Sequence, residues 1–79
     1  MSVTTAPKYN VLLAAAQLGN MTTIFDALYA DTEAPAWIEF YSATIIEQGG
    51  PLATLIQFAM NWTEADMTTL FDTANAMVV

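Results

Sequence analysis

The hexapeptide Met-Thr-Thr-Ile-Phe-Asp at residues 21–26 recurs as Met-Thr-Thr-Leu-Phe-Asp at residues 67–72. In both copies the apolar side chains fall at positions i, i+3 and i+4, the spacing that places them on one face of a helix. Each copy is therefore expected to be a helical segment that buries an apolar stripe. If Phe25 and Phe71 both point into one core, the chain is a self-contained bundle. A stripe that faces outward would instead be a site for a partner.

Proline, glycine and capping residues divide the chain into short helical segments. Gly19 follows the first segment, and the run Gly49-Gly50-Pro51 separates the third from the fourth. Asn20 is a favourable N-cap for the second segment, and Thr63 with Asp66 approximates a capping box for the fifth. We predict helices over residues 8–18, 21–30, 34–48 and 51–61, and a fifth that runs from this capping box to about residue 77.

The first six residues lack a helical period and include several β-branched side chains, which indicates an extended N-terminal arm. Such an arm is either disordered or laid on a neighbour. No linker or low-complexity stretch divides residues 7–79, so these are expected to form one helical domain. The predicted fold is all-α, a compact bundle of four to five short helices with an extended N-terminal arm.

The residues needed for catalysis or for transition-metal binding are scarce in this chain. It has no Cys and no His, which removes the usual thiolate and imidazole ligands and the commonest general base. The carboxylates at residues 31–33 and 64–66 lie where helix caps and helix dipoles explain them. No glycine-rich phosphate loop or calcium-binding loop is present. We therefore expect a protein that is not an enzyme and that carries no cofactor and no metal.

Charge disfavours nucleic acids and anionic membranes as partners. The net charge is −7, from eight carboxylates and the single cation Lys8. Affinity for phosphate groups comes largely from Lys and Arg side chains, and Lys8 is the single one in this chain. The longest uncharged run lies between Lys8 and Asp26 and is shorter than the roughly 20 residues a spanning helix needs. No signal peptide is visible, so we expect a location in the cytoplasm or within a virus particle rather than secretion.

The apolar fraction of 56% exceeds what one small core of this size is expected to hide. Some apolar surface should therefore remain available for a partner. Trp and Tyr are frequent anchors of protein interfaces, and the apolar C-terminus is expected to be packed. The predicted interface residues are Trp37, Tyr41, Phe58, Trp62, Met77 and Val78.

These features favour a non-enzymatic, small acidic structural or assembly protein that packs a helix face against copies of itself or a larger protein partner. A viral or phage particle component is the setting we expect. The alternative is an acidic inhibitor or immunity-type protein that binds a basic site on an enzyme or on a nucleic-acid-binding protein. That alternative requires Asp26, Glu33, Glu39, Glu64, Asp66 and Asp72 to share one face.

Overall fold

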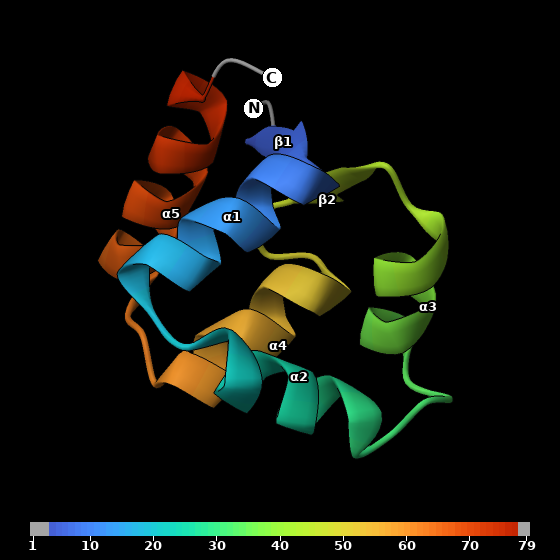
Figure 1. The fold of residues 1–79 in the computed structure, drawn as a ribbon. Coiled ribbons are helices and arrows are strands. Elements are labelled where there is room, and N and C mark those ends of the chain that lie inside the picture. The colour runs from blue at the N-terminus through green and yellow to red at the C-terminus, as the bar shows by residue number, and fades with distance from the viewer. Residues whose placement is uncertain (1–3, 78–79) are drawn as a thin grey trace.

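Five helices and two short strands make up residues 4–77, the part of the chain that the computed structural model describes (Figure 1). In chain order the elements are β1 (Thr5–Pro7), α1 (Lys8–Leu18), α2 (Met21–Tyr29), α3 (Pro35–Ser42), β2 (Ile45–Glu47), α4 (Pro51–Met60) and α5 (Glu64–Ala76). The fold is mostly helical, as predicted, with the addition of a small sheet.

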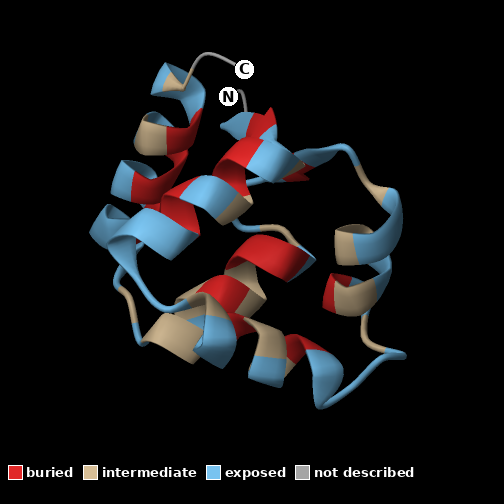
Figure 2. Ribbon diagram, viewed as in Figure 1, coloured by how far each residue is buried: buried red, intermediate tan, exposed pale blue. Residues whose placement is uncertain are grey.

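The helices form two groups, one made of α1 and α5 and the other of α2, α3 and α4. Helix α1 packs mainly against α5, and α4 packs against α2 and α3 (Figure 1). Buried residues lie on the inward sides of these helices (Figure 2). Helix α4 contributes Leu52, Ala53 and Ile56 to the core, all without exposed surface.

Local sequence signals account for most helix boundaries. The side chain of Asn20 accepts hydrogen bonds from the backbone N–H groups of Thr22 and Thr23, which confirms it as the N-cap of α2. Thr63 and Asp66 form the predicted capping box at the start of α5, with each side chain accepting from the other's backbone N–H. These bonds satisfy donors that a helix start otherwise leaves free.

The prediction of a helix over residues 34–48 is wrong beyond Ser42, where α3 ends. Ala43 is already extended, and residues 45–47 form strand β2. The β-branched pair Ile45 and Ile46 suits a strand better than a helix. Ile46 is completely buried in this strand, so tertiary packing decides the local structure.

Strand β2 pairs with the N-terminal segment in an antiparallel sheet, with Ala6 opposite Ile46. Backbone hydrogen bonds flank this pair, from Lys8 N to Thr44 O (2.8 Å) and from Gln48 N to Thr4 O (2.8 Å). The described part of the predicted arm is thus extended, but it pairs within the chain rather than being free or laid on a neighbour.

Both copies of the repeated hexapeptide turn their apolar stripes inward. In α5, Leu70 and Phe71 have no exposed surface, and in α2 Ile24 is equally buried. Phe25 is half-buried and packs against the edge of the core. Neither stripe is therefore left as a free surface, and the chain is self-contained at these two faces.

Candidate functional site

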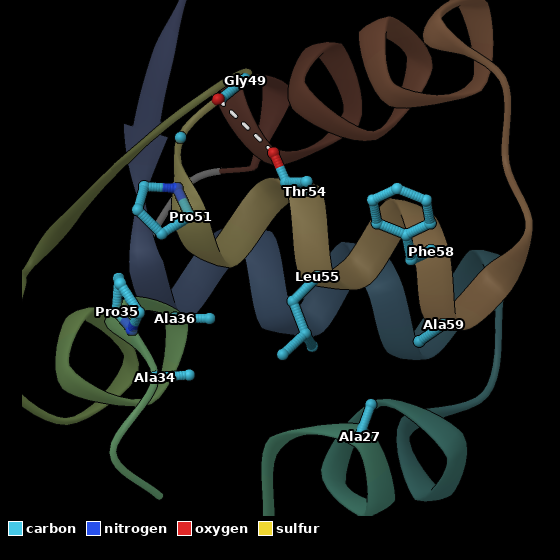
Figure 3. Close-up of a pocket in the computed structure, with 11 residues that line it drawn as sticks. Ala27, Ala34, Pro35, Ala36, Gly49, Pro51, Thr54, Leu55, Phe58 and Ala59 are labelled. Carbon is cyan, nitrogen blue, oxygen red and sulfur yellow. Dashed lines mark hydrogen bonds between the residues drawn. The ribbon is translucent and has the colours of Figure 1, made fainter. Parts of the chain in front are cut away.

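A hollow in the surface lies where α2, α3 and α4 meet, and we call it the α2–α4 groove (Figure 3). Its volume is about 760 Å³, and it is open to solvent rather than enclosed. Most of its lining is apolar, and most of the side chains are small. The lining residues are Ala27, Ala34, Pro35, Ala36, Gly49, Gly50, Pro51, Thr54, Leu55, Phe58 and Ala59.

A rigid turn before α4 forms one end of the groove. Gly49 has a φ of 86°, a conformation that favours glycine, and Pro51 begins α4 with a fixed φ. The hydroxyl of Thr54 lies 3.4 Å from the carbonyl oxygen of Gly49 and donates to it (Figure 3). The backbone N–H of Leu52 donates to a carboxylate oxygen of Glu39 at 2.9 Å, which ties α4 to α3. These bonds fix the shape of the turn.

Helix α4 supplies the large apolar side chains of the groove. Leu55 is half-buried and points from α4 toward the space between Ala34 and Ala27 (Figure 3). Phe58 stands on the same helix with 82% of its surface exposed, more than any other large apolar residue among residues 4–77. Burying a phenylalanine side chain fully contributes about 1.5–3 kcal/mol. Phe58 thus makes little of this contribution in the isolated chain.

A cluster of aromatic side chains joins α2 to α3 and includes two of the predicted interface residues. The Trp37 ring lies 5.0 Å from Tyr29, 5.8 Å from Phe40 and 6.3 Å from Tyr41, measured between ring centroids. Phe25 contacts Phe40 edge to face at 5.9 Å. Trp37 is half-buried by these contacts, whereas Tyr41 is 77% exposed. Trp37 therefore holds two helices together, and only Tyr41 offers a largely open ring.

The remaining predicted interface residues lie elsewhere. Trp62 follows α4 and is half-buried against the core. Its ring lies beside Gly19, since a Cβ placed on that glycine would be only 2.9 Å from the ring. Met77, directly after α5, is half-buried against the core. Val78 lies outside the described residues. Of the five predicted residues that the structure describes, Phe58 alone lines the groove, and these five do not form one surface.

The charges are nearly all negative and mostly exposed. Seven of the eight carboxylates are exposed, and Glu39 is half-buried. The ammonium group of Lys8 donates to the carbonyl oxygen of Phe40 at 2.7 Å and lies 5.8 Å from the centre of that ring. This places the single cation at the C-terminal end of α3, where the helix dipole favours it. With eight carboxylates and one such cation, at least seven negative charges have no Lys or Arg to neutralise them.

Sequence reasoning missed most of the groove because its walls are made by alanine, glycine and proline. These residues carry no distinctive chemistry, and a groove depends on how three separate helices meet. The run Gly49-Gly50-Pro51 was the single visible signal, and it indicated a turn rather than a binding surface.

Within residues 4–77 no group of three or more carboxylates is arranged to hold a metal ion. None of the helices in that range is long and apolar enough to cross a membrane. Comparison with known protein families, with curated proteins and with solved structures finds no match to this chain. The chemistry of the surface itself is therefore the basis for assigning a function.

Proposed function

We propose that this chain is a non-enzymatic structural or assembly protein that works by packing a helix face against another protein molecule. The α2–α4 groove is its docking surface. The observation that carries this proposal is the exposure of Phe58 at the border of an open groove of about 760 Å³ with apolar walls. An apolar hollow beside an exposed aromatic ring is a typical protein-binding surface.

The small size of the chain limits its stability when it is isolated. A domain of this length buries a smaller share of its surface than a larger one, so its stability is modest. A partner that covers the groove adds stability by mass action, since it binds the folded chain. The proposed setting is an assembly such as a virus particle, where each small subunit gains burial from its neighbours.

The second candidate is an acidic inhibitor or immunity-type protein that occupies a basic site. The abundance of unneutralised carboxylates favours it. Their placement does not, because Glu39 lies on α3 while Glu64, Asp66 and Asp72 lie on α5, at opposite sides of the molecule in Figure 1. Carboxylates on helices this far apart favour a dispersed acidic surface over one compact acidic face. This observation favours the docking groove over the inhibitor.

Photo-cross-linking tests the proposal. A photoreactive benzoylphenylalanine replaces Phe58 in the groove or, as a matched control, Thr69 on the exposed side of α5. We expect a cross-linked product from position 58, and none from position 69, when the protein is illuminated in cells of its source. Sedimentation and thermal unfolding of the purified protein over a range of concentrations complete the test. A thermally robust monomer that forms no cross-link from position 58 would refute the proposal.

A further inference from the structure

We infer that the occupant of the α2–α4 groove is a cationic amphipathic helix of a different protein. This inference rests on the proposed docking function and adds the shape and charge of the partner. Three observations carry it: the walls of the groove, the sign of the charges around it and the charge of the chain itself.

The walls favour a helix over an extended peptide. An extended peptide needs backbone partners for its own N–H and C=O groups, which an open sheet edge supplies. Most lining residues belong to α2, α3 and α4, whose interior backbone groups are used within each helix. In the Gly49-Gly50 turn, the N–H of Gly50 and both glycine carbonyl groups are hydrogen-bonded within the chain. The sheet of β1 and β2 lies at the other side of α4 (Figure 1). A bound helix satisfies its own backbone. The small side chains Ala27, Ala34 and Ala59 also allow a helix to approach closely.

Carboxylates neighbour the residues that line the groove, although none is itself a lining residue. Asp26 and Glu33 are exposed and precede the lining residues Ala27 and Ala34 in the sequence. The second carboxylate oxygen of Glu39 lies 3.8 Å from the position that a Cβ on Gly50 would take, so this carboxylate is next to the lining residue Gly50. The single cation, Lys8, is engaged by the carbonyl group of Phe40. A helix that places leucine-like side chains in the groove and Lys or Arg along its edges is the complementary partner.

The net charge argues against a second copy as the occupant. Each chain carries −7, and association would bring two such charges together without a cationic surface on either side. A cationic partner gains from the same charges that oppose self-association.

Binding of two designed peptides tests the inference. Both are about 18 residues long, enough for a stable helix, and share one apolar face of leucines at i, i+3, i+4 and i+7. The polar face carries Lys in one peptide and Glu in the other. Affinity for the full chain is measured by fluorescence anisotropy at about 50 mM and about 500 mM salt, which changes the screening of surface charges. We expect the Lys peptide to bind at least about tenfold more tightly than the Glu peptide at low salt.

Matched variants locate the site. Phe58→Ala removes an exposed side chain of the groove, and Tyr41→Ala removes an exposed ring outside it. Asp26→Asn with Glu33→Gln neutralises two charges at the border, and Glu64→Gln with Asp72→Asn neutralises two exposed charges on α5. We expect Phe58→Ala and the border pair each to weaken binding of the Lys peptide about three- to tenfold, and the two controls to change it less than about twofold.

The outcomes separate this inference from the proposed function. Equal binding of both peptides, weakened by Phe58→Ala, would overturn the cationic partner while keeping the groove as a docking surface. Binding that disappears at high salt and is unaffected by Phe58→Ala would overturn the inference as non-specific attraction. Self-association lost in the Phe58→Ala variant, with no peptide binding, would identify a second copy as the occupant. A monomer that binds neither peptide and gives no cross-link from position 58 would refute both.

Discussion

Replacing Gly19 with alanine is expected to destabilise the fold by steric overlap and not by backbone strain. Gly19 has a negative φ of −141°, so it does not adopt the left-handed conformation that favours glycine. A Cβ at this position would lie 2.6 Å from the sulfur of Met60 and 2.9 Å from the ring of Trp62. Ordinary contacts between such atoms are about 3.5–4.0 Å, so both neighbours would have to move.

The magnitude follows from two opposing effects. Overpacking costs about 1–3 kcal/mol in a close-packed core, and the lower end of this range applies because Gly19 is exposed and Met60 and Trp62 are only half-buried. A Gly→Ala substitution also raises the free energy of unfolding by about 0.4–1 kcal/mol, because it reduces the conformational entropy of the unfolded chain. We therefore expect Gly19→Ala to lower the free energy of unfolding by about 1 kcal/mol. A chain of this length has about 4–12 kcal/mol in total, so the loss is easily measured.

Urea unfolding followed by circular dichroism at the helix band provides the assay. The same substitution is then made in a Trp62→Phe background, where the shorter ring no longer reaches Gly19. The destabilisation by Gly19→Ala should become smaller there. Gly49→Ala is the control, because Gly49 has a φ of 86° and no neighbour within 4 Å, so its cost should be the same in both backgrounds. A Gly19→Ala variant as stable as the parent would refute the steric argument. Equal destabilisation in both backgrounds would exclude the Trp62 ring as the source of the overlap and leave the Met60 sulfur, which is 2.6 Å away.

Three further substitutions test other parts of the fold by the same unfolding measurement. Asn20→Ala removes the hydrogen-bonded cap of α2 and should cost about 1 kcal/mol, whereas an unchanged stability would show that the cap contributes nothing. Phe71→Ala should lower the free energy of unfolding by about 3–5 kcal/mol because the ring is fully buried. Phe25→Ala should lower it clearly less because that ring is half-exposed. Equal losses of stability would contradict the different burial of the two hexapeptide copies. Lys8→Gln removes the ammonium contact with Phe40 and should cost about 1–2 kcal/mol, and a more stable variant would count against this contact.

The sequence predicted the helices well wherever the signals were local. Helix α1 covers the predicted residues 8–18, and α2 and α4 end one residue earlier than predicted. The caps at Asn20 and Thr63 were predicted because a cap involves residues only two or three positions apart. The i, i+3, i+4 spacing of the repeated hexapeptide likewise indicated which face of each helix is buried.

The predicted interface residues show where sequence reasoning reached its limit. Trp37 and Trp62 were chosen for their residue type, and the structure uses both rings in contacts within the chain. The type of an aromatic residue does not reveal whether its neighbours cover it. Phe58 and Tyr41 are aromatic like the two tryptophans, but their side chains remain largely exposed because no element of the described chain packs over them.

Tertiary structure alone decided the sheet and the groove. Ile46 forms a strand because Ala6, 40 positions earlier in the chain, lies opposite it, and no local signal encodes that pairing. The α2–α4 groove exists because small side chains from three helices meet without filling the space between them. The sequence by itself determined most helix boundaries, the caps and the inward faces, since these depend on neighbours along the chain; the end of α3 was decided by tertiary packing. The surface left open for a partner depends on contacts between distant segments, so only the folded chain defines it.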